Sequence, residues 1–213
     1  MFHVKHRSSA ELDAALDRYV ALARRYHATL DLMSDAGLAR LDRHVADALR
    51  YVDAVASLDP EPQRLLDIGS GVGLPGIVIA AALPELAVEL VERRRKRATF
   101  LRMAAAAVGR ADVVVRDADV RATRGERTDV VTAQAVARLA EVYRLVRHRT
   151  ADPVVLVARK GAEWREEVEE LARCATEAEE ASSTDVLRQE PLEGSGTLVA
   201  VRVRGGRPCR SSA

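Results

Sequence analysis

A run of closely spaced glycines follows the first strongly apolar segment of the chain and has the residue types of a cofactor-binding turn. Gly69, Gly71 and Gly73 alternate with other residues. Residues without a Cβ let a strand-to-helix turn bring backbone N–H groups against a ligand. The segment from Gly71 to Gly76 also satisfies G-x-G-x-x-G, a pattern of dinucleotide-binding loops. The glycines alone therefore leave a nicotinamide dinucleotide and S-adenosylmethionine both open.

Two carboxylates at predicted strand ends narrow this choice. Asp67 precedes the glycines, and Glu92 closes the next predicted strand. The Asp67 carboxylate suits the cationic amino group of a methionine moiety, whereas it would face a pyrophosphate with like charge. Glu92 can accept hydrogen bonds from both ribose hydroxyls of either cofactor. The alternative is that both carboxylates only cap the following helices. The pair favours S-adenosylmethionine.

A further acidic position follows the third predicted strand. Asp117, Ala118 and Asp119 are placed there to bracket an adenine ring. In that arrangement Asp119 would accept a hydrogen bond from the exocyclic amine.

Five consecutive basic residues come directly after Glu92, close to the mouth of the predicted site: Arg93, Arg94, Arg95, Lys96 and Arg97. We expect them to grip RNA phosphates. The alternative is a solvated first helical turn, which the helix macrodipole disfavours. Arg159 and Lys160 end the fifth predicted strand on the same edge and share the expected role. Aromatic residues make up only 3% of the chain, so phosphate and shape recognition would have to dominate over base stacking.

No other constellation indicates a reactive centre. The two cysteines and five histidines lack metal-ligand spacing, so we expect no metal. No Ser/His/Asp or Cys/His arrangement points to a nucleophilic triad, and we name no catalytic residue.

The elements that must position these residues change type near residue 61. Ser8 to Glu11 has capping-box spacing, and helical periodicity runs on to Ala23 and again from Leu38 to Ala56. Short β-rich runs then alternate with helical stretches, which predicts a doubly wound, Rossmann-like α/β sheet under an N-terminal helical cap. The expected strands span residues 64–68, 87–92, 112–115, 129–133, 153–158 and 197–203.

This pattern predicts three parts. Residues 1–60 form the N-terminal segment and cap, 61–204 the cofactor-binding domain, and 205–213 a disordered tail. The alternation in residues 197–203 is typical of a half-exposed edge strand.

Composition limits the partners and the compartment. Lys plus Arg number 33 and Asp plus Glu 32, so any nucleic-acid contact must be a local basic patch. No apolar run reaches the length of a membrane helix or of a secretion signal. We expect a cytoplasmic protein without a membrane contact.

The motifs together resemble those of the bacterial small-subunit ribosomal RNA guanine-N7 methyltransferases, also called the glucose-inhibited division protein B family. The resemblance covers most of the chain. It rests on the segment from Asp67 to Gly76 with its Leu-Pro-Gly ending, on Lys96-Arg97 with Phe100-Leu101-Arg102, on Arg159-Lys160-Gly161, and on the stretch around His44 and Asp47. The chain looks like a diverged, actinobacterial-type member.

The resemblance implies a class I methyltransferase fold, S-adenosylmethionine as cofactor and 16S ribosomal RNA in the small ribosomal subunit as substrate. It implies cofactor contacts at Gly69, Leu74, the Ala118-Asp119 pair and Gln134. The family usually has an arginine where this chain has Gln134, and Arg138 is a candidate to compensate. Two alternatives follow from this departure: a paralogue that methylates another RNA or a small molecule, and a non-catalytic module that binds the cofactor or RNA.

Overall fold

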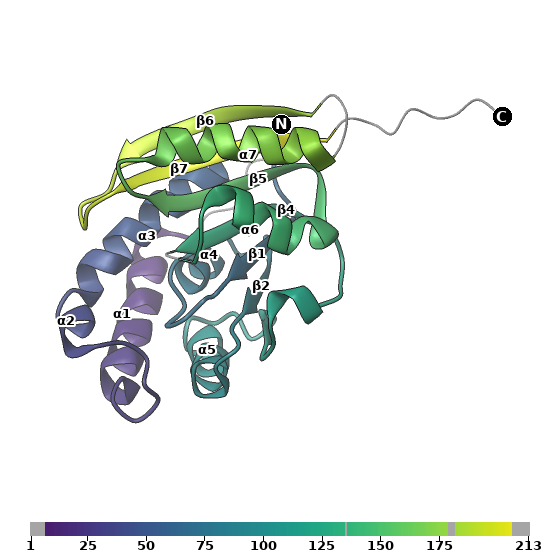
Figure 1. Ribbon diagram of the computed structural model, residues 1–213. Coiled ribbons are helices and arrows are strands. Elements are labelled where there is room, and N and C mark those ends of the chain that lie inside the picture. Colours follow the sequence, from purple (N-terminus) through teal and green to yellow (C-terminus); the bar gives the residue numbers. More distant parts are fainter. Residues whose placement is uncertain (1–6, 135, 179–181, 206–213) are drawn as a thin grey trace.

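Seven strands form one mixed sheet in the computed structural model, which describes residues 7–134, 136–178 and 182–205 (Figure 1). The strands are β1 (Arg64–Ile68), β2 (Ala87–Val91), β3 (Val114–Arg116), β4 (Thr128–Gln134), β5 (Thr150–Lys160), β6 (Ser183–Pro191) and β7 (Thr197–Arg204). Their spatial order is β3-β2-β1-β4-β5-β7-β6. The chain therefore reverses direction across the sheet between β3 and β4, beside β1.

The first five strands pair in parallel, which confirms the doubly wound α/β prediction. Parallel pairing brings their carboxyl ends to a single edge of the sheet, here called the carboxyl edge. β7 runs antiparallel to β5, and β6 runs antiparallel to β7. The predicted residues 64–68 match β1, and the other five predicted strands overlap observed ones.

The prediction that residues 197–203 form an edge strand is wrong. β7 lies between β5 and β6, and its side chains from Leu198 to Val201 are buried. The edge strand is β6, which the sequence analysis missed. Its residues are mostly polar and exposed, and a bulge between Val186 and Arg188 breaks the alternation that marks a strand.

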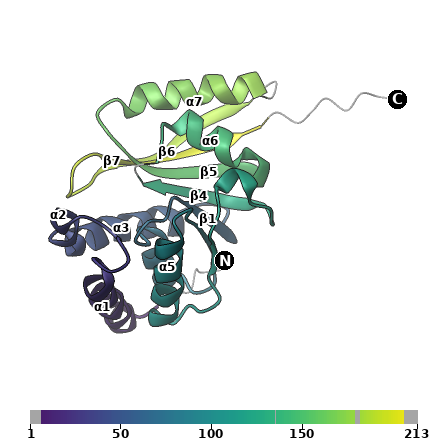
Figure 2. The ribbon, with the colours of Figure 1, turned by 60° about the horizontal axis from the view of Figure 1, so that its bottom comes forward.

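Helices cover both faces of the sheet in two layers (Figure 2). One layer holds α1 (Ser9–Tyr26), α3 (Leu41–Ala56), α4 (Gly76–Ala82) and α5 (Arg95–Ala107), and the other holds α6 (Leu139–Val146) and α7 (Trp164–Ala178). Alternate strand residues serve the two layers: Leu65 packs with the first and Leu66 with the second. The cap helices thus share their core with the sheet.

The predicted cap helices are present with one difference. Ser8 forms the expected capping box with Glu11 at the start of α1. The second periodic series divides into a one-turn helix, α2 (Asp35–Leu38), and α3. Residues 1–6 of the predicted N-terminal segment and 206–213 of the predicted tail lie outside the described residues.

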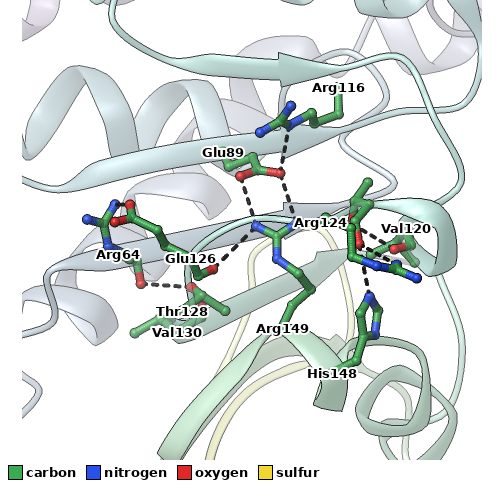
Figure 3. A network of polar contacts seen from close by, with 11 residues as sticks. Arg64, Glu89, Arg116, Val120, Arg124, Glu126, Thr128, Val130, His148 and Arg149 are labelled. Carbon is green, nitrogen blue, oxygen red and sulfur yellow. Dashed lines mark hydrogen bonds and ion pairs between the residues drawn. The ribbon is translucent and has the colours of Figure 1, made fainter.

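A buried ion pair joins the strands at the edge opposite the carboxyl edge (Figure 3). Arg149, 3% exposed, donates to both carboxylate oxygens of Glu89 on β2 at 3.2 and 3.0 Å and to Thr123 Oγ1 at 3.0 Å. A Cβ on Gly125 would lie 2.8 Å from Arg149 Nη2. The guanidinium therefore connects β2, the β3–β4 connection and the start of β5.

We predict that Arg149→Met lowers the free energy of unfolding by about 3 kcal/mol, because it leaves the Glu89 carboxylate with fewer partners at a partly buried position. The estimate is at the lower end for buried pairs because Arg116 also contacts Glu89. Urea unfolding measures the loss. Arg204→Gln, which removes the exposed pair with Asp185, is the control and should cost at most about 1 kcal/mol. Equal losses of unfolding free energy in the two variants would show that the buried Arg149 pair stabilises the fold no more than an exposed pair does.

Candidate functional site

A cavity of about 430 Å³ opens at the carboxyl edge of the sheet. The ends of β1, β2 and β4, the connection after β3 and one face of α6 form its walls. Its lining residues are Ile68, Gly69, Val91, Glu92, Arg93, Arg94, Arg97, Ala118, Asp119, Val120, Arg121, Gln134, Val136, Glu141 and Leu145. Here it is called the carboxyl-edge cavity. It lies at the position where the connections leave in opposite directions, which is where doubly wound folds bind ligands.

The glycine loop forms one wall with bare backbone. Gly69 has a φ of +63°, and a Cβ there would lie 3.0 Å from Val136 Cγ2 across the cavity. Gly73 has a φ of +100° and no room for a Cβ beside Ile77. The loop therefore needs glycine for both conformation and close approach.

Glu92 holds this loop to the neighbouring strand. One carboxylate oxygen accepts from the Gly71 N–H at 2.9 Å and the other from the Arg94 N–H at 2.8 Å. The side chain is 5% exposed and lines the cavity. A carboxylate has four lone-pair sites, so both oxygens keep capacity for a ligand's hydroxyls.

Asp67 lies beneath the loop and outside the cavity lining. It is 1% exposed, and its Oδ1 accepts from Thr132 Oγ1 at 2.6 Å. Among the described residues its Oδ2 has no hydrogen-bond partner, and a Cβ on Gly76 would lie 2.7 Å from it. Burial raises the pKa of Asp67 to about 6, while the Thr132 hydroxyl acts in the opposite direction. Asp67 thus joins β1, β4 and the start of α4 under the loop, and its expected contact with a ligand stays a prediction.

The cap supports the same loop from outside. Tyr19, fully buried on α1, donates from its hydroxyl to the Val72 carbonyl at 3.0 Å. Burial raises the pKa of Tyr19, so this donor keeps its proton. The remaining loop residues of the sequence prediction, Gly71, Gly73 and Leu74, shape the loop without lining the cavity.

The wall after β3 carries Ala118 and Asp119, as predicted. The Asp119 carboxylate accepts from Arg121 Nε at 2.9 Å and Nη2 at 2.7 Å. This contact holds the pKa of Asp119 well below its usual range, so the group is ionised. Asp119 is half-exposed, which leaves it accessible to a ligand that competes with Arg121.

Gln134 ends β4 and lines the cavity. Arg138 is the nearest following arginine in the sequence, but it does not line the cavity. Arg138 points to α7, where its Nε donates to Glu170 at 2.7 Å. Compensation by Arg138 for the arginine missing at position 134 stays a prediction. The register partner of Gln134 on β5 is Arg159.

Of the seven predicted phosphate-binding residues, some are exposed and others form contacts within the protein. Arg93, Arg95 and Lys96 are exposed and form no hydrogen bond or ion pair through their side chains within the described residues. Arg97 Nε donates to the Asp31 carbonyl at 3.0 Å, and Arg94 lies 3.7 Å from the Asp31 carboxylate. The basic run thus fastens α5 to the cap through two members and presents three to solvent.

Lys160 is buried, contrary to the expected phosphate contact. Its ammonium pairs with Glu167 on α7 at 2.9 Å and donates to the Ala137 carbonyl. Glu167 also accepts from the N–H of Leu139 at the start of α6. Lys160 therefore fixes the segment after β4 and does not face a partner.

Sequence reasoning missed several residues that line the cavity. Glu141 and Leu145 lie one turn apart on α6, and their spacing of four residues places both on one helix face. Arg121 is signalled only by its spacing from Asp119. Within the part of the chain that the structure describes, three or more potential metal ligands do not gather anywhere.

Over the described ranges, no helix has the length and apolar character needed to cross a membrane.

Comparison with known families identifies one match. Residues 13–193 match the family model described as rRNA small subunit methyltransferase G. Proteins named ribosomal RNA small subunit methyltransferase G are similar to the chain: 42% identity over 141 residues in Acidothermus cellulolyticus and 35% over 202 residues in Halorhodospira halophila. The first alignment covers 63% of this chain and 60% of the relative, and the second 91% and 90%. The chain thus spans less than two thirds of the first relative's length.

Solved structures share the fold at low sequence identity. The ribosomal protein L11 methylase of Lactobacillus delbrueckii has a TM-score of 0.57 at 13% identity, covering 82% of this chain and 81% of that one. The O-methyltransferase of Bacillus cereus has a TM-score of 0.56 at 14% identity, covering 93% and 92%. These structures confirm the class I methyltransferase sheet with its reversed final hairpin.

We predict a pH-dependent stability difference between the wild type and Asp67→Asn. Because the folded state binds the Asp67 proton more tightly than the unfolded state does, this group stabilises the fold most below about pH 4. That contribution is lost as the pH rises through about 6. A shift of about two pKa units corresponds to about 3 kcal/mol. Urea unfolding of both proteins between pH 4 and pH 7 measures it.

The exposed Asp53→Asn exchange is the matched control and should show no such trend. A difference for Asp67→Asn that stays constant with pH, or that favours the wild type more as pH rises, would contradict this assignment.

Proposed function

This chain belongs to the rRNA small subunit methyltransferase G family of S-adenosylmethionine-dependent methyltransferases, and from that premise we propose that it methylates N7 of a guanine in 16S ribosomal RNA. The observation that carries the proposal is the carboxyl-edge cavity, with its bare glycine wall and the buried Glu92 that holds it. We propose further that it acts in the cytoplasm on the small ribosomal subunit. Its position as an actinobacterial-type member stays a prediction.

The residues around the cavity fit S-adenosylmethionine. Gly69 lines the cavity with main-chain atoms only, next to the apolar side chain of Val136, which an added Cβ would meet at 3.0 Å. Glu92 has lone pairs left for two ribose hydroxyls. Ala118 and Asp119 would flank the adenine, and Gln134 would lie toward the methionine end. Asp67 and Leu74 would shape this site from behind.

When bound, the cofactor supplies an electrophilic methyl group on a sulfonium centre. Guanine N7 carries a free lone pair, so the chain's residues have to orient the two partners and need not remove a proton. The segment held by Lys160 follows β4 and is fixed by its ion pair with Glu167. A rigid segment there would keep the target guanine at a constant angle to the cavity. Orientation alone would then suffice, and no residue is expected to remove a proton.

The exposed cations of the basic run would bind the RNA backbone. Arg93 lines the cavity, and Arg95 and Lys96 follow it at the start of α5. Three cations close to the mouth can fix the register of the RNA without reading its bases.

Because Gln134 is uncharged, two other functions are alternatives: methylation of another RNA or a small molecule, and binding of the cofactor or RNA without catalysis. One experiment separates the three. Purified protein is incubated with methyl-labelled S-adenosylmethionine and small subunits from a strain that lacks this methylation. Label at guanine N7 of 16S RNA is the expected result. Label in another RNA or a small molecule would replace the proposal with a paralogue function, and cofactor binding without transfer would replace it with a binding module.

We predict that Glu92→Gln weakens S-adenosylhomocysteine binding at least about tenfold. The amide nitrogen can neither accept from the Gly71 N–H nor replace a charged acceptor for the ribose. Calorimetric titration measures the affinity. Glu85→Gln makes the same charge change at an exposed position before β2 and should leave the affinity unchanged. Wild-type affinity in a folded Glu92→Gln protein would remove Glu92 from the cofactor site.

We predict that the triple variant Arg93→Gln, Arg95→Gln, Lys96→Gln binds small subunits with a salt dependence shallower by about two to three units. Each lost phosphate contact lowers the slope of log K against log salt by about 0.7 to 0.9. The control triple Arg144→Gln, Arg165→Gln, Arg173→Gln removes the same number of positive charges as the first triple, but from α6 and α7. Equal slopes for the two triples would show that the basic run does not contact RNA.

A further inference from the structure

Arg159 is a cation beside the cavity that forms no ion pair within the part of the chain that the structure describes. The nearest carboxylate is that of Asp47, on the other side of Gly194: a Cβ on Gly194 would lie 2.7 Å from Asp47 Oδ2 and 3.6 Å from Arg159 Nη2. It pairs in register with Gln134, so the two side chains project to the same face of the sheet, about 5 Å apart at the backbone. That face carries the cap. Burial of His44 on α3, together with the nearby Arg159, lowers the pKa of the imidazole. Arg159 therefore lies between the cap and the mouth of the cavity.

Two cations near Arg159, Lys160 and Arg138, are ion-paired, and Arg159 differs from them. Lys160 pairs with Glu167, and Arg138 pairs with Glu170. In the described residues Arg159 forms no ion pair, and its Nη2 donates to a neutral acceptor, Ser195 Oγ, at 2.9 Å. A guanidinium has five N–H donors in a planar fork, so most of this fork remains free for an oxyanion.

Ser195 belongs to a strained turn between β6 and β7, seen beside α3 at the left of Figure 1. Its φ is +119°, in a region that side chains rarely adopt and that glycine adopts at little cost. The serine lies between two glycines, Gly194 and Gly196. The turn thus keeps a side chain at the one position where a glycine would remove strain.

The rest of the turn is clamped, which is why the strain persists. Asp47 Oδ1 on α3 accepts from the Glu193 N–H at 2.9 Å. A Cβ on Gly194 would lie 2.7 Å from Asp47 Oδ2, and a Cβ on Gly196 would lie 2.6 Å from the Lys160 carbonyl. These contacts hold the turn against α3 and β5. The Ser195 hydroxyl then accepts from Arg159, which lies toward the cavity.

We infer that Ser195 is a positioning residue that holds the Arg159 guanidinium toward a backbone phosphate of the RNA strand carrying the target base. This inference rests on the proposed function for the identity of the strand. A hydroxyl fixes the guanidinium without neutralising it, which an acidic partner would do. The geometry explains why a strained serine is kept beside a free cation.

The decisive variant is Ser195→Gly, because strain and positioning act on it in opposite directions. Removing the side chain relieves the φ of +119° and should raise the melting temperature. Loss of the hydroxyl frees the guanidinium and should weaken small-subunit binding about threefold to fivefold. Arg159→Gln should weaken it about tenfold and lower the salt slope by about one. The double variant should bind like Arg159→Gln alone, because Ser195 acts through Arg159.

Two further variants complete the design. Ser195→Asn offers an amide oxygen to the guanidinium, so it should bind small subunits more tightly than Ser195→Gly does. Ser183→Gly makes the same change in the extended backbone of β6, and should lower the melting temperature without changing binding. Affinity is measured by anisotropy with small subunits and S-adenosylhomocysteine at two salt concentrations.

A Ser195→Gly protein that gains stability and keeps wild-type affinity would overturn the inference, as would additive losses in the double variant. Weaker binding of S-adenosylhomocysteine alone, with unchanged RNA affinity, would also overturn it by assigning Arg159 to the cofactor carboxylate. Failure of the proposed function is distinct: the wild type would bind small subunits but transfer no methyl group to guanine N7.

Discussion

The close approach of the glycine-loop backbone to its neighbours is the constraint on which the site depends. The loop runs between Val136 across the cavity and Asp67 beneath it, at distances that exclude a Cβ at Gly69 and Gly76. Such backbone has few side chains of its own to hold it, so other elements must. Glu92 binds it from β2, and Tyr19 binds it from the cap. A loop held from two directions can present its main chain to a ligand without rearranging.

The charges around the cavity follow from this constraint. Two buried charges at this edge, Asp67 and Lys160, have their partners within the scaffold, because an unpaired charge is costly in a dry interior. Arg93, which is exposed, and Arg159, which is partly buried, form no ion pair within the described residues. Burial therefore separates basic residues of the carboxyl edge that stabilise the fold, such as Lys160, from those that can bind a partner, such as Arg93.

The cap has a similar double use. Its helices share the core of one sheet face, so they stabilise the fold by burying apolar area. They also carry polar contacts to the site: Tyr19 to the loop, Asp31 to α5, and Asp47 to the turn after β6. Without the cap the loop, the basic helix and the final turn would each lose a partner.

Local sequence determined the elements with strong periodicity and clear punctuation. The run from Arg64 to Ile68, the capping box at Ser8 and the glycine loop were readable because their signals lie within a few neighbouring residues. The doubly wound arrangement followed from the βαβ pattern, whereas the order of the strands came from the structure. β6 escaped because its polar, bulged sequence resembles a loop, and it is a strand only because β7 offers it a ladder of hydrogen bonds.

Within the site, the sequence by itself placed at the carboxyl edge the residues that end or follow a predicted strand, and it missed those on α6. Only the tertiary structure decided what each one does there. Asp67 and Arg159 both end or nearly end strands, yet one is sealed under the loop and the other stands beside the cavity. Burial and partners come from residues distant in the chain, Thr132 for Asp67 and Ser195 for Arg159, and a local pattern carries no record of them.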